Sequence, residues 1–198
     1  NVSRNSFYEL LSGFDSSLNI DISVNNIWEA IGKQKISKAP GLDGIPMEAF
    51  IYGGARLGVH LALLFNCFIR HSYLPSAFMD SMIIPLVKNR HGDLTNIDNY
   101  RAIMISNSVS KLLESVILNV LEKYMPVNDV QFGFKHGLST TLCTDTLRKT
   151  VDYYRSRGSH VFVCFIDFTK AFDFVNYWKL FTKLIDLNVP ACVVSLLA

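Results

Sequence analysis

The sequence carries little excess charge of either sign. Its 198 residues include 19 Lys and Arg against 17 Asp and Glu, so the formal net charge is only +2. A strongly basic balance would indicate nucleic acid as a partner, and this balance does not by itself demand one. Hydrophobic residues make up 49% of the chain and charged residues 18%, which excludes a disordered chain and predicts a sizeable core.

Cysteine is scarce and lacks any ligand pattern. The four cysteines are Cys67, Cys143, Cys164 and Cys192. They form no CxxC pair and lie at no metal-ligand spacing from the five histidines, which argues against a zinc site or a disulfide framework. We expect free thiols in a reducing compartment, with Cys67 and Cys164 buried because they lie inside apolar runs.

No apolar run reaches the roughly 20 residues that are needed to cross a bilayer. The first residues also lack a basic start followed by an apolar core, so no secretory signal is visible. We expect an intracellular protein, in the cytoplasm or the nucleus, that is not secreted and has no membrane partner. Because the sequence begins with Asn and ends within the apolar run 193–198, we also expect a segment of a longer protein.

Hydrophobic periodicity predicts a helix-rich fold with few strands. Helices are predicted over residues 20–35, 55–72 and 108–125, in a stretch that runs through 150–154, and over 177–187. Strands are predicted over residues 81–88, 102–106 and 161–166, and Asn176 is a candidate N-cap. Because helices alternate with a few strands of unequal pattern, we expect an α+β arrangement rather than a regular βαβ fold.

The segment 161-VFVCFIDFTKAFDFV-175 joins six consecutive apolar residues to an aspartate, and a second aspartate follows six positions later. The simplest role for Asp167 is to cap the following turn through its side chain. A phosphoryl-accepting role is disfavoured. One such motif needs an acid at position 169, which is Thr, and another needs an acidic pair at an earlier strand end, where Lys88 and Ser106 stand.

A metal-binding role is the remaining alternative for Asp167. Mg²⁺ prefers hard oxygen ligands and is usually held by one or two carboxylates together with substrate phosphates. In two-metal nucleotidyl transfer, the ions activate the attacking oxygen and stabilise the leaving oxygen. One aspartate cannot hold two ions, so further acids would have to come from another strand.

Five sequence blocks, in order along residues 35–176, share a pattern with one protein family. They are 38-KAPGLDGIP-46, 83-IIPLVKNRHGDLTNIDNYRAIMIS-106, 110-SKLLESVI-117, 131-QFGFKHGLSTT-141 and 167-DFTKAFDFV-175. Together they resemble the reverse transcriptases of non-LTR (LINE-type) retrotransposons. Ala102 stands where this family usually has proline, and Lys135 stands where it usually has arginine.

The resemblance implies an RNA-directed DNA polymerase, a nucleotidyltransferase with a right-hand polymerase fold. It implies an N-terminal extension helix region over residues 1–34, fingers with palm-flanking helices over 35–160, and the start of the palm over 161–198. The palm would be partial, because no Tyr/Phe-x-Asp-Asp block follows Asp167 in the sequence. We therefore expect this chain to be inactive by itself.

The resemblance also implies roles for residues in the last block. Asp167 would be catalytic and, with the main-chain carbonyl of Phe168, would bind the metal ions, two Mg²⁺ in the complete enzyme with Mn²⁺ as a substitute. Phe172 would lie under the sugar of the incoming nucleotide and exclude a 2′-hydroxyl. The backbone amides of Lys170 and Ala171 would face the triphosphate, because amides in a turn bind anions.

Other blocks would supply the remaining contacts. Arg101 and Lys88 would reach the triphosphate from the fingers, and a planar guanidinium suits bidentate phosphate contact. The alternative role for each is a solvated surface base. Gln131, Gly133 and Gly137 would form a template-side loop, in which glycine allows a close backbone approach to nucleic acid. An ordinary turn is the alternative there.

Two further aspartates are expected to be structural. Asp173 is expected to cap the following helix or to pair with a base, and Asp43 is expected to form a turn with Gly44.

The implied partners of the complete protein are an RNA template, a DNA primer, deoxynucleoside triphosphates, and the rest of the palm and the thumb in a parent polyprotein. A hypothesis of another class also stays open. The chain would then be a decayed or reused reverse-transcriptase-like fragment that binds nucleic acid or a partner without catalysis.

Overall fold

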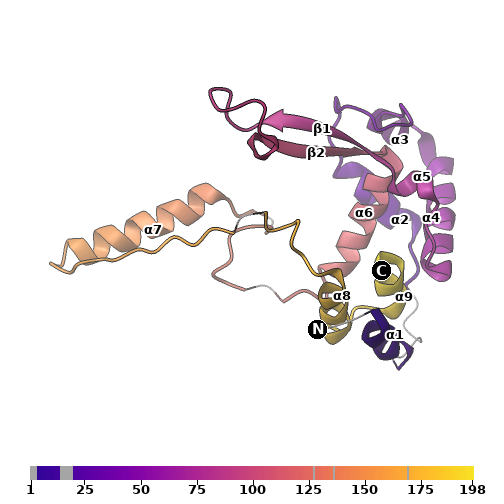
Figure 1. Ribbon diagram of the computed structural model, residues 1–198. Helices are drawn as coiled ribbons and strands as arrows, with labels where there is room; N and C mark the ends of the chain where they lie inside the picture. Colours follow the sequence, from indigo (N-terminus) through magenta and orange to yellow (C-terminus); the bar gives the residue numbers. More distant parts are fainter. Residues whose placement is uncertain (1–3, 14–19, 127, 136, 169) are drawn as a thin grey trace. The chain divides into compact units, whose positions relative to one another are not determined.

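Two compact units make up the described part of the chain (Figure 1). The computed structural model describes residues 4–13, 20–126, 128–135, 137–168 and 170–198. The first unit comprises residues 1–124 and 176–198, and the second comprises residues 125–175.

The first unit is built mainly from helices. Its N-terminal helices are α1 (Arg4–Ser12), α2 (Val24–Gly32), α3 (Met47–Ile51), α4 (Gly54–His71) and α5 (Ser76–Met79). The strands β1 (Ser81–Val87) and β2 (Tyr100–Ser106) follow, with the short helix η1 (Ile97–Asn99) between them. The unit is completed by α6 (Ser108–Leu121), α8 (Tyr177–Asp186) and α9 (Ala191–Leu197). No helix in the described ranges is long and apolar enough to cross a membrane.

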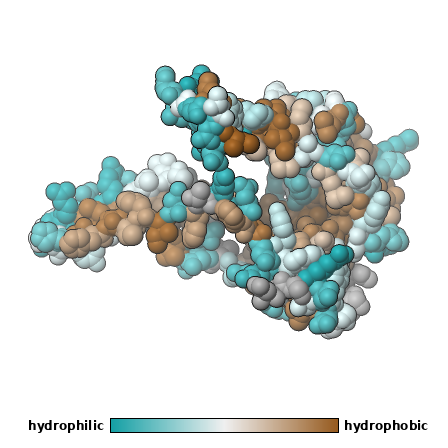
Figure 2. Space-filling view, in the orientation of Figure 1, coloured by the Kyte–Doolittle hydropathy of each residue, from teal (hydrophilic) through white to brown (hydrophobic). Residues whose placement is uncertain are grey.

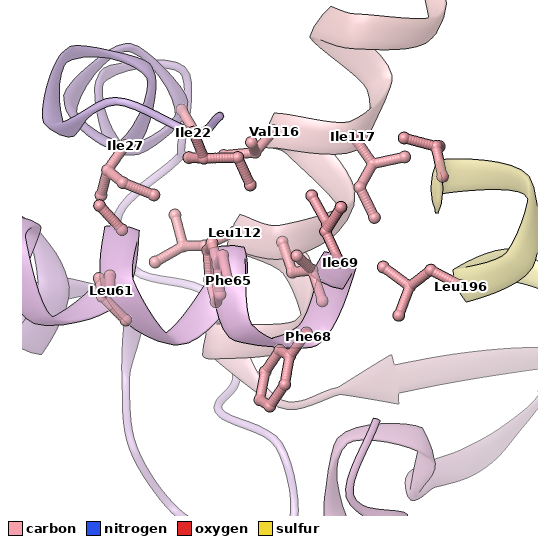
Figure 3. Close-up of a cluster of buried hydrophobic side chains, with 14 of the residues drawn as sticks. Ile22, Ile27, Leu61, Phe65, Phe68, Ile69, Leu112, Val116, Ile117 and Leu196 are labelled. Carbon is pink, nitrogen blue, oxygen red and sulfur yellow. The ribbon is translucent and has the colours of Figure 1, made fainter. Parts of the chain in front are cut away.

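The core of the first unit lies where α2, α4, α6 and α9 meet (Figure 3). Ile27 of α2, Phe65 of α4 and Leu112 of α6 are completely buried there. Leu196 of α9 adds an apolar side chain from the other end of the chain. Each such burial contributes roughly 1.5–3 kcal/mol relative to exposure, so this contact is the main source of stability for the unit.

Side-chain hydrogen bonds fix the start of α2 and its position against α4. Ser23 Oγ accepts from Asn26 N at 3.2 Å, and Asn26 Oδ1 accepts from Ser23 N at 3.0 Å. These reciprocal bonds satisfy two amides that a helix start leaves unpaired. Asn66 of α4 accepts from Ile22 N at 2.8 Å and donates to Ile22 O at 2.9 Å, which ties the two helices together.

An aromatic cluster joins α1 to α8. The ring centroid of Phe7 lies 5.6 Å from that of Trp178 and 5.7 Å from that of Phe181. The helix α8 begins at the predicted N-cap, because Asn176 Oδ1 accepts from Lys179 N at 3.0 Å. Hydrophobic periodicity predicts α8 but none of the helices α1, α3, α5 and α9.

The predicted strands 81–88 and 102–106 are confirmed as an antiparallel hairpin, in which Ser81 pairs with Ser106 and Val87 with Tyr100. Pro85 lies within β1, which is possible because each strand of a two-stranded sheet is an edge strand. Figure 2 shows apolar side chains at the surface of this hairpin.

The second unit contains the helix α7 (Thr140–Arg155). Its N-cap is Ser139, whose Oγ accepts from Leu142 N at 3.3 Å. No residue of α7 is buried, and Figure 2 shows apolar side chains along its surface. Beyond a turn at residues 156–159 the chain runs in the opposite direction to α7 (Figure 1).

The predicted strand over residues 161–166 is wrong. Residues 160–168 are extended, but they pair with no strand in the described part of the chain. Phe162 is 95% exposed and Phe165 is 82% exposed, whereas the prediction has them buried. The composition favours a strand, but a strand also needs a neighbour to pair its amides and carbonyls.

The prediction of buried thiols is also wrong for Cys67 and Cys164, because both are exposed. Cys67 lies on the solvent side of α4, and Cys164 lies in the extended segment. Cys67, Cys143 and Cys164 are free thiols, as predicted.

Two buried polar side chains at the junction of β2 and α6, Asn107 and Ser108, bind the loop at residues 41–45. Asn107 Oδ1 accepts from Asp43 N at 3.4 Å, and Asn107 Nδ2 donates to Ala77 O at 2.9 Å. Ser108 Oγ donates to Ile45 O at 2.8 Å. The junction, the loop and α5 are therefore joined at one point.

The turn predicted at Asp43 and Gly44 is confirmed. Asp43 Oδ1 accepts from Ile45 N at 3.0 Å, and Gly44 N donates to Gly41 O at 3.1 Å. Gly41 meets the junction directly, because a Cβ at this position would lie 2.3 Å from Asn107 Oδ1 and 2.6 Å from Asn107 Cα.

We predict that Gly41→Ala destabilises the protein by about 1–3 kcal/mol, because the added methyl group overpacks the contact with Asn107. Urea denaturation followed by circular dichroism measures the change. Gly32→Ala is the matched control, since nothing lies within 4 Å of a Cβ there. The control variant should be unchanged or more stable by up to about 1 kcal/mol. Equal effects of the two substitutions would refute the close contact.

Candidate functional site

The tip of the β1–β2 hairpin is closed by one side chain. Asn99 Oδ1 accepts from Asn89 N at 3.0 Å, and Asn99 Nδ2 donates to Asn89 O at 2.9 Å and to Asp93 O at 3.1 Å. The segment that joins β1 to β2 is therefore internally hydrogen-bonded, and it includes η1.

Asp93 adds a charge-assisted contact within this tip. Thr95 donates to Asp93 Oδ1 from Oγ1 at 2.6 Å and from N at 2.8 Å, and these bonds lower the pKa of Asp93. Because the pKa of Asp93 is lower in the folded state than in the unfolded state, these hydrogen bonds stabilise the fold at a pH above the unfolded pKa. This stabilisation is lost as the pH falls through the folded pKa.

Two of the predicted phosphate-binding residues lie on this hairpin. Arg101 lies in β2 opposite Leu86, is exposed, and forms no ion pair within the described residues. Lys88 differs, because its Nζ donates to Asp98 O at 2.8 Å and its backbone N donates to Asn99 O at 2.7 Å. The Lys88 ammonium therefore has a structural contact, and the Arg101 guanidinium faces solvent.

The predicted template-side residues lie in a loop of the second unit. Gln131 Nε2 donates to Gly133 O at 2.9 Å, and Lys135 Nζ donates to Asn128 O. A Cβ at Gly133 would meet nothing within 4 Å, and Gly137 has a φ of +77°. Gly137 thus has a backbone reason to be glycine, and Gly133 has open space above it.

Asp167 lies at the end of the extended segment and is exposed. It makes no hydrogen bond or ion pair within the part of the chain that the structure describes, so it caps no turn there. The neighbouring Phe168 is 78% exposed.

Residues 170–175 form a helical turn directly after this carboxylate. Lys170 has a φ of +53°, and its carbonyl accepts from Asp173 N at 3.0 Å and from Phe174 N at 3.3 Å. The turn places Phe172 at the surface, 78% exposed. Asp167, Lys170, Ala171 and Phe172 thus lie within one short segment of the second unit.

The predicted role of Asp173 as a helix cap or a partner of a base is wrong for the described residues. The N-cap of α8 is Asn176, three positions later. No described base forms an ion pair with Asp173.

The described side chains do not by themselves fit a two-metal site. No group of three or more His, Cys, Asp or Glu side chains that could hold a metal ion occurs among the residues that the structure describes. One exposed carboxylate and one carbonyl are too few ligands for two Mg²⁺ ions.

Sequence reasoning missed the buried junction residues Asn107 and Ser108, which position the hairpin. Both are polar residues between a strand and a helix, and such residues are usually read as an exposed cap or turn. Their burial depends on the loop at residues 41–45, which lies far away in the sequence. The one trace of this contact in the sequence is the glycine at position 41, which the close approach to Asn107 requires. That reason for the glycine becomes clear only when Asn107 is known to be its neighbour.

The sequence of this chain is similar to those of known proteins. A family model described as "Reverse transcriptase (RNA-dependent DNA polymerase)" matches residues 87–197. The chain belongs to this family, and the predicted family membership and α+β class are confirmed. Among its relatives are reverse transcriptases of non-LTR retrotransposons, so the predicted LINE-type resemblance is also confirmed.

Three relatives illustrate this similarity. The chain is 28% identical over 168 residues (84% of this chain) to a putative 115 kDa protein in the type-1 retrotransposable element R1DM of Drosophila melanogaster. It is 30% identical over 166 residues (82%) to a probable RNA-directed DNA polymerase from transposon BS of the same species. It is 28% identical over 191 residues (91%) to the RNA-directed DNA polymerase from mobile element jockey of Drosophila funebris. The chain spans only 16%, 18% and 20% of the lengths of these three relatives, respectively.

We predict that Asn99→Ala accelerates tryptic cleavage after Arg90 in the hairpin tip by about tenfold. Loss of 1.4 kcal/mol of hydrogen bonding, within the range expected for these contacts, raises the open population by that factor. Time-resolved mass spectrometry of the digest measures the rate. Asn128→Ala, which lies outside the hairpin, should leave that rate unchanged. An unchanged rate in the Asn99 variant would show that the side chain does not close the tip.

Proposed function

We propose that this chain is the fingers and the beginning of the palm of an RNA-directed DNA polymerase that acts as part of a longer polypeptide. One observation carries the proposal. The family match over residues 87–197 includes every residue that the sequence assigns to metal, nucleotide or template. In this proposal, residues 1–34 form an N-terminal extension, residues 35–160 the fingers and residues 161–198 the start of the palm.

In the proposed site, Asp167 is the catalytic carboxylate. It contributes one oxygen ligand to a divalent-metal site, with Phe168 O beside it, and other parts of the polypeptide supply the remaining ligands. Mg²⁺ is the expected ion, because it suits hard oxygen ligands and substrate phosphates. The exposure of Asp167 supports this role, since a carboxylate that serves a shared site has to be reachable.

The nucleotide contacts follow from the positions of the side chains. Arg101 is the stronger phosphate-binding candidate of the hairpin, because Lys88 Nζ is already bonded to a backbone carbonyl. Phe172 is the proposed sugar selector, since its exposed flat ring has no acceptor for a 2′-hydroxyl. Lys170 and Ala171 would present backbone amides to the triphosphate.

The proposed template contacts are made by Gln131, Gly133 and Gly137. The open space above Gly133 supports a close backbone approach by nucleic acid. The proposed substrates are an RNA template, a DNA primer and deoxynucleoside triphosphates.

We predict that Asp167→Asn in the longer polypeptide lowers primer extension on an RNA template by at least about a thousandfold. A lost metal ligand removes several kcal/mol of transition-state stabilisation, and each 1.4 kcal/mol is tenfold in rate. Asp173→Asn is the matched control and should retain activity. Retained activity in the Asp167 variant would contradict the assignment. If the wild-type polypeptide shows no primer extension, the alternative of a decayed or reused fragment is favoured.

The chain of residues 1–198 alone is predicted to be inactive in the same assay with Mg²⁺ or Mn²⁺. One carboxylate is too few for a two-metal site, and Mg²⁺ gives up its water ligands reluctantly. If this chain extends a primer and Asp167→Asn abolishes that activity, a second carboxylate must complete the site, and Asp173 is the first candidate.

We predict that Phe172→Val in the longer polypeptide raises the ratio of ribonucleotide to deoxynucleotide incorporation by at least about tenfold. Removing a clash with the 2′-hydroxyl is expected to change the discrimination by about 1–3 kcal/mol. Single-nucleotide incorporation with paired UTP and dTTP measures the ratio. Phe174→Val is the matched control, because both rings are 78% exposed. A change in both variants, or in neither, would leave Phe172 without a selecting role.

A further inference from the structure

Four lysines line one hollow of the first unit, which we call the lysine pocket. It has a volume of about 380 Å³ and is lined by Lys33, Gln34, Lys35, Lys38, Ala39, Met47, Ser108 and Lys111. The lysines come from the end of α2, the loop that follows it, and the first turns of α6. No acidic side chain lines the pocket, so its described lining carries four positive charges without a compensating negative one.

The loop that carries two of these lysines is held in a defined shape. Ser37 lies between Lys35 and Lys38 and has a φ of +59°, a conformation that residues other than glycine seldom adopt. Glu48 of α3 stabilises it, because Glu48 Oε1 accepts from Ser37 N at 2.6 Å. This hydrogen bond lowers the pKa of Glu48, so the contact is with the charged carboxylate near neutral pH.

The other two lysines are also positioned by neighbours. Lys33 Nζ donates to Asn119 Oδ1 at 2.6 Å. Lys111 is half-buried on α6 and is attracted by Glu114, which lies one turn further along the helix and does not line the pocket. Lys35 and Lys38 form no ion pair within the described residues. Their ammonium groups are therefore the ones available to an added anion.

We propose that the lysine pocket binds the phosphodiester backbone of a single-stranded nucleic acid. The nature of this ligand rests on the proposed function, whereas the anion preference rests on the charges alone. Ammonium groups suit phosphate oxygens, and several of them side by side release counterions when a polyanion binds. Ala39 and Met47 add apolar surface for the sugars.

The position of the pocket relative to the hairpin favours a strand over a single phosphate. Ser108 lines the pocket and lies two residues after β2 ends. Arg101 lies five residues before that end, which is ~17 Å along a strand that rises ~3.3 Å per residue. A continuous strand can reach across a distance of that order, whereas a single phosphate cannot.

The test is fluorescence anisotropy of a labelled 12-nucleotide oligouridylate with the chain 1–198 over a series of KCl concentrations. The pocket variant is Lys35→Gln/Lys38→Gln/Lys111→Gln. The control variant, Lys149→Gln/Lys179→Gln/Lys183→Gln, changes the net charge equally outside the pocket. Thermal melts verify that both variants fold.

We expect the pocket variant to bind at least about tenfold more weakly at 100 mM KCl. The slope of log K against log salt should fall by about 2, since each lost phosphate contact on a single strand removes ~0.7. The control variant should change by less than about threefold, because its lysines contact no bound strand. Equal effects of the two variants, or no effect of the pocket variant, would overturn the proposal.

A second variant separates a shaped pocket from general charge attraction. Glu48→Ala removes one negative charge, which raises the net charge by one, but it also releases the amide of Ser37. A shaped pocket predicts weaker binding of the 12-mer despite the added charge, and tighter binding would overturn the proposal. Tripolyphosphate tests the source of the phosphate. If it binds the wild-type chain as tightly as the 12-mer does, the ligand is a free polyphosphate and the assignment to a nucleic-acid strand is wrong.

Failure of the proposed function can be told apart from failure of this inference. Asp167→Asn should leave oligouridylate binding unchanged, because Asp167 does not line the pocket. Pocket-dependent binding in a polypeptide without polymerase activity would uphold the pocket and refute the polymerase. If polymerase activity depends on Asp167 but oligouridylate binding does not depend on the pocket lysines, the proposed function is upheld and the lysine pocket is refuted.

Discussion

The hydrogen bonds of Asn107 determine how the first unit is assembled around its hairpin. Its amide bonds to the loop at Asp43 and to α5 at Ala77, and Gly41 approaches it more closely than any larger residue could. A buried amide has to be satisfied, so the loop and α5 cannot move away without leaving polar groups unpaired. The base of the hairpin and one wall of the lysine pocket are thereby tied to the helical core.

In the second unit, by contrast, the backbone polar groups of one segment have no protein partner among the residues that the structure describes. Residues 160–168 have a composition that favours a strand, but no strand lies beside them in the described part of the chain. Phe162, Phe165 and Ile166 remain exposed over residues 160–168, next to the carboxylate of Asp167. Extended backbone without a ladder leaves its amides and carbonyls to water. The reverse transcriptase match covers this segment together with β2 and α8, so the family pattern is present even where its predicted strand is not formed.

Several elements could be predicted because their causes are local. The apolar periodicity of α4 and α6 predicts both helices, and Asn176 predicts the start of α8 through a bond to an amide three residues away. The clustering of Asp167, Lys170 and Phe172 is also local, because one short segment carries all three. The exposure of Cys67 could not be predicted, since an apolar run does not say which side of a helix faces the core.

The sequence by itself determined the family of this protein, most of its helices, its hairpin and the identity of the candidate catalytic block. Each of these depends on residues close together in the chain or on their order along it. Tertiary structure alone decided that residues 161–166 stay unpaired, that Asn107 is buried and that four lysines share one hollow. These outcomes depend on contacts between distant residues such as Ser108 and Ile45, and a linear pattern does not specify which distant partner a side chain will meet.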